Sequence, residues 1–188
     1  MLSRYLEKPI LDDLAEKMVF LGGPRQVGKT TLVKTLGQGR FKGNVKYLNW
    51  DAREDKKRIL AGTFAADEAL IIFDEIHKYR HWKTFIKGFF DKNRGQYRII
   101  VTGSSRLDVY RKGGDSLLGR YHHYRLHPLS LHEVVSKSVP HAHVGRALGF
   151  QDSTRETRDT LDRLLKFGGF PESCDSSGTS KGERSISC

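Results

Sequence analysis

The sequence predicts an α/β fold with a mainly parallel β-sheet flanked by helices. Short apolar segments alternate with amphipathic ones along most of the chain, which is typical of strands connected by helices. One of them, residues 69–75, is apolar up to its two terminal acids, as expected of a strand covered on both faces. Glycine-rich or polar turns follow several of these segments, at the carboxyl ends where such sheets bind ligands.

Each element is expected from its own pattern. Residues 2–14 carry apolar side chains at helical spacing. We predict strands over residues 18–23, 45–50, 69–75, 97–105 and 121–129. Further helices are expected over 29–36, 52–60, 81–93, 130–135 and 157–167. The first of these closes at Gly37, Ser130 caps the fourth, and Gly168 and Gly169 end the last.

The composition predicts a cytoplasmic protein. The 188 residues are 37% hydrophobic, which suffices for the core of one domain. No apolar run approaches the roughly 20 residues that span a bilayer, and the N-terminus lacks the apolar segment of a signal peptide. We therefore expect no membrane partner. Both cysteines, Cys174 and Cys188, lie near the end of the sequence, whereas a secreted disulfide scaffold would have more of them, spread through the fold. Residues 173–188 are rich in Ser and Gly, so we expect one domain over 1–172 and a disordered tail over 173–188.

The charge is strongly basic. The formal net charge is +11, and lysine and arginine are densest between Lys78 and Arg125. Two interpretations remain open: a solvated basic face, or a surface that contacts the phosphates of a nucleic acid.

The segment GPRQVGKT, from Gly23 to Thr30, matches the phosphate-loop pattern G-x-x-x-x-G-K-[ST] between an expected strand and an expected helix. Its glycines allow backbone N–H groups to converge on one phosphate, and the helix adds its positive N-terminal end. Lys29 can reach the β- and γ-phosphates, and the Thr30 hydroxyl can bind Mg²⁺. The predicted nucleotide-binding residues are Gly23, Pro24, Arg25, Gln26, Val27, Gly28, Lys29, Thr30 and Thr31.

Asp74 and Glu75 end the apolar segment over 69–75, which is the acidic pattern that accompanies phosphate loops. Asp74 is predicted to hold Mg²⁺ together with Thr30, and Glu75 to orient and deprotonate an attacking water. His77 follows in a D-E-x-H sequence, and we interpret it as the start of a helix without a catalytic role.

Two further predictions concern the γ-phosphate. Thr102 and Ser104 lie in the polar turn into which the strand segment over 97–105 runs, so either hydroxyl could contact the γ-phosphate or the attacking water, or could cap the next helix. Arg120 precedes the last expected strand. It could stabilise charge in the transition state, in its own subunit or a neighbouring one, or could be a surface arginine.

Several segments together resemble one family of prokaryotic ATPases. In chain order they are GPRQVGKTTL, YLNWD, IIFDEIHKY, IIVTGSSR, SLLGRYHHYRLHPLSLHE and FGGFPE. They are similar to the AAA+-like ATPases named AAA_14, which are usually joined to a C-terminal DUF4143 region. The resemblance runs from Leu2 to Glu172 and implies a P-loop NTPase with an AAA+-like core that binds ATP. It also implies a sensor position at the TGSS segment.

Members of this family continue beyond the G-G-F-P-E sequence, whereas here a Ser/Gly-rich tail follows, so we expect a shortened member. Three functions remain open. The first is Mg²⁺-dependent ATP hydrolysis that drives a conformational change. The second is a nucleotide-dependent, nucleic-acid-binding switch with little turnover, and the third is an inactive remnant of a longer ATPase. An oligomer or a missing C-terminal domain could complete the site.

Overall fold

Five parallel strands form one sheet in the computed structural model, which describes residues 3–42, 44–65, 67–104, 117–135 and 154–172. Their order across the sheet is β2-β3-β4-β1-β5, and every neighbouring pair is parallel. All five carboxyl ends therefore lie at one edge of the sheet, as the α/β prediction requires. The strands are β1 (Met18–Gly22), β2 (Val45–Asn49), β3 (Leu70–Asp74), β4 (Arg98–Thr102) and β5 (Tyr121–Arg125).

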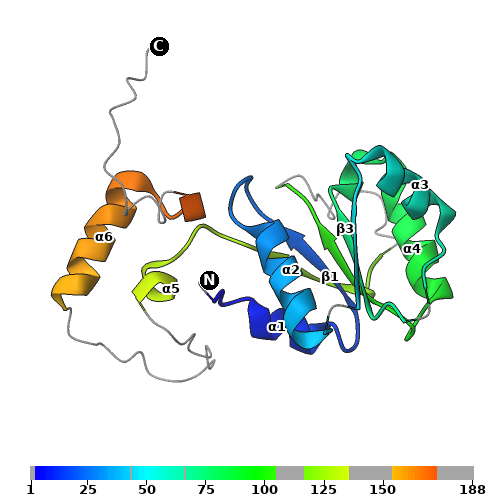
Figure 1. Cartoon of the computed structure of the whole chain (residues 1–188), viewed down its shortest axis with the longest axis horizontal. Helices are drawn as coiled ribbons and strands as arrows, with labels where there is room; N and C mark the ends of the chain where they lie inside the picture. Colours follow the sequence, from blue (N-terminus) through cyan, green and yellow to red (C-terminus); the bar gives the residue numbers. More distant parts are fainter. Residues whose placement is uncertain (1–2, 43, 66, 105–116, 136–153, 173–188) are drawn as a thin grey trace, which may run out of the picture.

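Helices cover both faces of the sheet (Figure 1). On one face, α1 (Glu7–Asp13) and α2 (Lys29–Arg40) pack over an aliphatic cluster. On the other face lie α3 (Arg53–Ala61), the short 3-10 helix η1 (Ile76–Lys78) and α4 (Trp82–Lys92). Every residue of β1 and β3 is buried because both faces of these strands are covered, which explains their continuous apolar sequences.

Aromatic side chains fill the cluster beneath α4. The fully buried Phe73 ring meets the Phe89 ring edge-on, with centroids 5.6 Å apart, and Phe64 packs edge-on against both. Burial of one such side chain contributes about 1.5–3 kcal/mol to folding, and the edge-on geometry adds to that. The cluster thus holds α4 against β3, whose last residue is Asp74.

Two helices continue beyond β5: α5 (Leu131–Val135) and α6 (Arg155–Phe167), which pack against each other. Figure 1 shows them at the end of the molecule away from α3 and α4. Ser130 caps α5 as predicted, since its Oγ accepts from the Glu133 N–H at 3.3 Å. Helix α6 begins two residues before the predicted start and ends before Gly168, whose φ is +80°.

The predicted end of α2 at Gly37 is wrong. The helix continues to Arg40, and the Gly37 backbone packs closely against Val45 of β2. This glycine permits a close approach between helix and sheet and does not terminate the helix.

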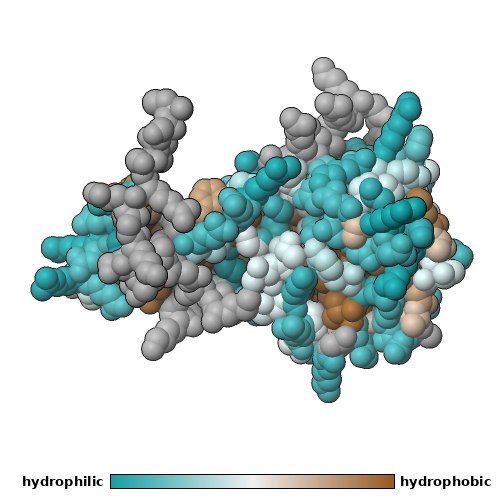
Figure 2. All heavy atoms as spheres, turned by 45° about the horizontal axis from the view of Figure 1, so that its top comes forward, coloured by the Kyte–Doolittle hydropathy of each residue, from teal (hydrophilic) through white to brown (hydrophobic). Residues whose placement is uncertain are grey.

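The face drawn in Figure 2 is mainly hydrophilic, with small and separate apolar areas. Among the described residues, no helix is long and apolar enough to cross a membrane. The predicted tail over 173–188, with Cys174 and Cys188, lies outside the described residues.

Two glycines of α2 provide a test of this packing. A Cβ at Gly37 would lie 2.8 Å from a Val45 methyl, whereas one at Gly39 would meet nothing within 4 Å. We expect Gly39→Ala to raise the free energy of unfolding by about 0.5–1 kcal/mol, through helix propensity. Gly37→Ala should lower it by about 1 kcal/mol, because the overpacking outweighs the same gain. Urea unfolding of both variants measures the difference, and equal stabilisation would contradict the close contact.

Candidate nucleotide-binding site

The loop between β1 and α2 carries the motif from Gly23 to Thr30. Gly23 lies so close to the neighbouring backbone that an added Cβ would be 2.5 Å from the Leu126 carbonyl oxygen. Gly28 precedes α2 with a φ of +94°, a left-handed conformation that favours glycine. The first N–H groups of α2 have no partner within the helix, and no side chain caps them. The loop therefore ends in a helix N-terminus that suits an anion.

Lys29 folds back into this loop. Its side-chain nitrogen donates to the carbonyl oxygens of Gly23 at 3.0 Å and Pro24 at 2.6 Å. Burial lowers the pKa of Lys29 below its ordinary value of 10.5, although the carboxylates of Glu75 and Asp74 oppose this shift. The ammonium is thus held by neutral carbonyl groups, which it can exchange for phosphate oxygens by rotating its flexible side chain.

The carboxylate of Asp74 joins four elements. It ends β3 and is 5% exposed. Its Oδ2 accepts hydrogen bonds from Thr30 Oγ1 at 3.1 Å and from the Tyr47 hydroxyl, while Oδ1 accepts from Thr102 Oγ1 at 2.5 Å. The register places Thr102 directly opposite Asp74, whereas Tyr47 lies opposite Ile72, two residues before Asp74 on β3. Such hydrogen bonds offset the cost of burying a carboxylate.

Glu75 has a strained backbone. Its φ is +58°, a left-handed conformation that costs a residue other than glycine of order 1–3 kcal/mol. Its N–H donates to the Thr102 carbonyl oxygen at 3.0 Å, which helps hold this conformation. Glu75 Oε2 lies 3.3 Å from Lys78 Nζ and 3.8 Å from His77 Nε2. Lys78 also donates to Asp51 at 2.5 Å, so one lysine joins two carboxylates.

The two hydroxyls at the end of β4 have different surroundings. Thr102 is fully buried, and its hydroxyl is bonded to Asp74. Ser104 Oγ lies 3.4 Å from His77 Nε2, and His77 is in turn close to Glu75. The hydroxyl of Ser104 thus lies near His77, which is close to Glu75, whereas the hydroxyl of Thr102 is bound to Asp74.

Arg120 is not at this site. It precedes β5, and its carbonyl oxygen accepts from the Met18 N–H at the start of β1. Its guanidinium pairs with Asp91 of α4 at 2.8 Å. At about 3.3 Å per residue, the length of β1 separates it from the phosphate loop by roughly 17 Å. Of the alternatives for Arg120, the structure favours a surface arginine over one that acts on the γ-phosphate of its own subunit. A contribution to a neighbouring subunit stays a prediction.

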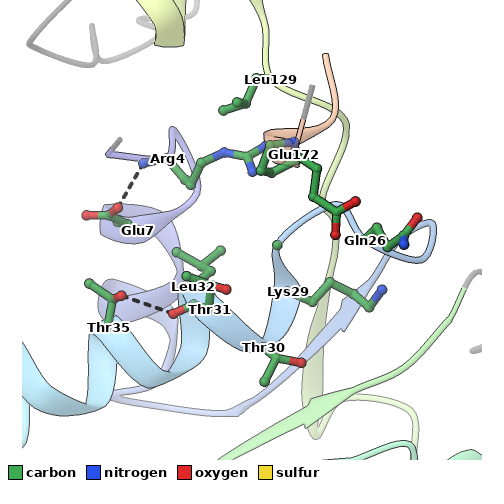
Figure 3. Close-up of a pocket in the computed structure, with 12 residues that line it drawn as sticks. Arg4, Glu7, Gln26, Lys29, Thr30, Thr31, Leu32, Thr35, Leu129 and Glu172 are labelled. Atoms are coloured by element: carbon green, nitrogen blue, oxygen red, sulfur yellow. Dashed lines mark hydrogen bonds between the residues drawn. The ribbon is translucent and has the colours of Figure 1, made fainter. Parts of the chain in front are cut away.

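A cavity of about 470 Å³ opens beside the loop, within the size range of small-molecule sites. Figure 3 shows Lys29, Gln26 and Glu172 around the same space, so the C-terminal part of the described chain meets the phosphate loop there. The residues that line it are Arg4, Glu7, Gln26, Gly28, Lys29, Thr30, Thr31, Leu32, Thr35, Leu129, Pro171 and Glu172.

The oxygens that meet at the loop suit one kind of metal. Among the described residues, no group of three or more His, Cys, Asp or Glu side chains could form a metal cage. Thr30 Oγ1 and Asp74 Oδ2 do lie side by side, 3.1 Å apart. Mg²⁺ is usually held by one or two carboxylates together with substrate phosphates and water. The pair therefore fits Mg²⁺ shared with a phosphate.

Sequence reasoning missed three residues of this region. Tyr47 contacts Asp74 because β2 lies beside β3, and strand order is not readable from a single sequence. His77 occupies η1, near the helix start that was predicted, yet its imidazole lies close to Ser104. Arg4 is a buried arginine, and nothing in the local pattern indicates that its side chain faces inward. Only the contacts between distant segments identify these residues.

The buried imidazole of His77 predicts an acid-sensitive fold. Burial lowers the pKa of His77 below 6.5, although the nearby Glu75 carboxylate opposes the shift. The unfolded chain then binds the proton more readily than the folded chain. The stabilisation is therefore complete above pH 6.5 and is lost as the pH falls toward the lower pKa of the folded state.

We expect His77→Gln to make the free energy of unfolding less dependent on pH below 6.5 than it is in the unsubstituted chain. Urea unfolding at a series of pH values measures this dependence, and His81→Gln at the exposed neighbouring histidine is the control. An unchanged pH dependence in His77→Gln would show that this imidazole does not resist protonation in the fold.

Comparison with known proteins supports this reading of the fold. The sequence profile of an AAA domain family, AAA_14, matches residues 15–135. The structure of AMPPCP-bound DnaA from Aquifex aeolicus is similar to this one, with a TM-score of 0.53 and 15% identity, covering 89% of this chain and 56% of that one. The RuvB Holliday junction branch migration motor of Thermotoga maritima gives a TM-score of 0.49 at 15% identity, covering 69% of this chain and 46% of that one.

The chain thus spans about half the length of these solved structures, and at this identity the likeness to DnaA concerns the fold alone. No curated protein sequence matches it. The family profile, by contrast, covers well over half of the chain and includes both the phosphate loop and the acidic pair. The chain belongs to the AAA_14 family of AAA domains, on the P-loop fold of AAA+ ATPases.

Proposed function

We propose that this chain binds ATP with Mg²⁺ and hydrolyses the β–γ phosphoanhydride, and that the cycle drives a conformational change. One observation carries the proposal: the hydroxyl of Thr30, on the phosphate loop, lies 3.1 Å from the carboxylate of Asp74, at the end of another strand. A phosphate-binding loop and an acidic strand end that meet in this way are the two parts that Mg²⁺-dependent phosphoryl transfer requires.

In this proposal the phosphate loop holds the triphosphate. The N–H groups at the start of α2 donate to phosphate oxygens, and Lys29 exchanges its two carbonyl partners for the β- and γ-phosphates. The cavity beside the loop takes the nucleoside. The residues proposed to contact the nucleotide are Gly23, Pro24, Arg25, Gln26, Val27, Gly28, Lys29, Thr30 and Thr31.

Thr30 and Asp74 would hold Mg²⁺, which supplies charge neutralisation at the phosphates. Tyr47 and Thr102 support this role, because their hydroxyl donors fix the orientation of the Asp74 carboxylate. Burial and the bond to Asp74 raise the pKa of Tyr47, so its hydroxyl remains a proton donor at neutral pH.

Glu75 would orient the attacking water and take its proton. Lys78 Nζ lies 3.3 Å from the Glu75 carboxylate. His77 lies between Glu75 and Ser104, within reach of both side chains. We assign Ser104 the role of contacting the γ-phosphate or the water. The strained backbone of Glu75 is consistent with a residue whose orientation matters more than its local stability.

Two variants and one control variant test this function. We expect Lys29→Ala to weaken Mg-ATP binding by at least about tenfold, since a cation next to phosphates is lost.

Glu75→Gln should keep ATP binding but lower turnover by about 10²–10⁴-fold, because the proton acceptor is removed. Lys46→Gln, which removes a lysine paired with Glu68, is the control and should change neither. Calorimetry gives the binding and phosphate release gives the turnover; unaltered turnover in Glu75→Gln would refute hydrolysis at this site.

A second candidate function is nucleotide-dependent binding of nucleic acid. The observation that favours it is a row of lysines on α4: Lys83 and Lys87, both half-buried, lie one turn apart, and the exposed Lys92 follows. Arg120 and Lys78 contribute less to this surface than the sequence suggests, since both are paired with carboxylates.

For this second function we expect DNA affinity to fall with salt, with a log–log slope of about −0.9 for each phosphate contacted. Replacing Lys83 and Lys87 by Gln should make the slope shallower, while Lys56→Gln with Lys57→Gln, on α3, should leave it unchanged. Fluorescence anisotropy with and without ATP measures both effects. Affinity that does not respond to salt would exclude an electrostatic nucleic-acid surface.

A further inference from the structure

Arg4 lies outside every motif of the sequence, yet the residue is only 7% exposed and its side chain makes three hydrogen bonds. Nη1 donates to the Val27 carbonyl oxygen at 3.0 Å, Nη2 to the His127 carbonyl oxygen at 2.6 Å, and Nε to Glu133 Oε1 at 2.9 Å. Figure 3 shows this side chain extending from the N-terminal segment along the rim of the cavity. A planar guanidinium is suited to such a fork of acceptors, whereas an ammonium is not.

The contact with Val27 falls at a sensitive point of the phosphate loop. Val27 immediately precedes Gly28, whose left-handed conformation turns the chain into α2 and so places Lys29. A Cβ on Gly28 would lie 3.6 Å from Arg4 Nη1, so the guanidinium also lies against this turn. Holding the Val27 carbonyl oxygen therefore restricts the peptide that orients the start of α2.

The partner of Arg4 is itself tied to another helix. Glu133 is 3% exposed, and its Oε2 accepts from Ser130 N at 2.9 Å and from Ser130 Oγ at 3.0 Å, which forms the cap of α5. Its Oε1 also accepts from Tyr5 N at 3.2 Å. Although burial opposes it, hydrogen bonds from Ser130 and Arg4 lower the pKa of Glu133. The carboxylate thus connects the start of the chain to α5.

We infer that Arg4 is a positioning residue of the phosphate loop, because its guanidinium holds the Val27 carbonyl oxygen. Its pairing with Glu133 makes nucleotide affinity depend on the position of α5. This inference rests on the proposed nucleotide site. A ligand that orders the loop strengthens the contacts of Arg4, and a change at α5 that releases Glu133 weakens the loop. Coupling of this kind is reciprocal by thermodynamic necessity.

A purely structural role for the ion pair between Arg4 and Glu133 predicts a different result. Removing one partner of a buried pair destabilises the whole fold, and every protected amide then exchanges faster through global unfolding. A positioning role affects the loop first. The exchange of the Leu32 amide, which donates to the Gly28 carbonyl oxygen at 2.9 Å in the first turn of α2, separates the two roles when it is compared with the amides of β4, and it needs no nucleotide.

The test uses Arg4→Lys, which keeps the charge but loses the fork, and Glu133→Gln, which keeps an acceptor at the α5 cap but loses the ion pair. In both we expect exchange of the Leu32 amide to rise by about tenfold, the loss typical of a charged hydrogen bond, with β4 unchanged. Mg-ATP affinity should weaken by a similar factor, again about tenfold. Lys46→Gln, on β2, is the control for loss of an ion-paired cation elsewhere.

Each outcome decides the question. Faster exchange at Leu32 without a change in β4 supports the inference, and it does so even if the unsubstituted chain binds no ATP, a result that would overturn only the proposed function. A uniform rise across the sheet, or no rise at Leu32, overturns the inference. If Arg4→Lys does not fold, Glu133→Gln alone decides, by the same comparison between Leu32 and β4.

Discussion

The buried carboxylate of Asp74 is the constraint on which the site depends. It accepts hydrogen bonds from hydroxyls of α2, β2 and β4. A buried carboxylate without such donors would be costly, so these four elements gain stability only when they come together. The same bonds orient the carboxylate toward the phosphate loop. The interaction that stabilises the edge of the sheet is therefore also the one that would orient the carboxylate for the Mg²⁺ that we propose.

The order of the strands makes this arrangement possible. In the sequence β1 precedes β2, but in the sheet β4 lies between β1 and β3. Thr102 is consequently opposite both Leu21 and Asp74 in the register. The phosphate loop and the acidic pair are separated by the width of one strand, and Ser104 emerges from that strand beside His77 and Glu75.

A second set of contacts ties the loop to the ends of the domain. Arg4 joins the N-terminal segment, the phosphate loop and α5, and residues 168–172, the last that the structure describes, come to the same place. There the Leu129 N–H donates to the Gly169 carbonyl oxygen at 2.6 Å, and Pro171 and Glu172 reach the cavity. A movement of α5 or of residues 168–172 relative to the sheet would change these contacts. The contacts therefore offer a physical route by which a conformational change and nucleotide binding could affect each other.

The sequence by itself determined the strands, the helices and the two motifs. Apolar runs, helical spacing and the glycine pattern of the phosphate loop are local properties, and each element forms within a few residues of its expected position. The tertiary structure alone decided that the Thr102 hydroxyl bonds to Asp74 and that Ser104 lies near His77. It also decided that Arg120 pairs with Asp91 of α4, at the amino-terminal ends of the strands. It also decided that Arg4 is buried, with a partner 129 residues away. These outcomes depend on strand order and on contacts between distant segments, and neither leaves a periodic trace in a single sequence.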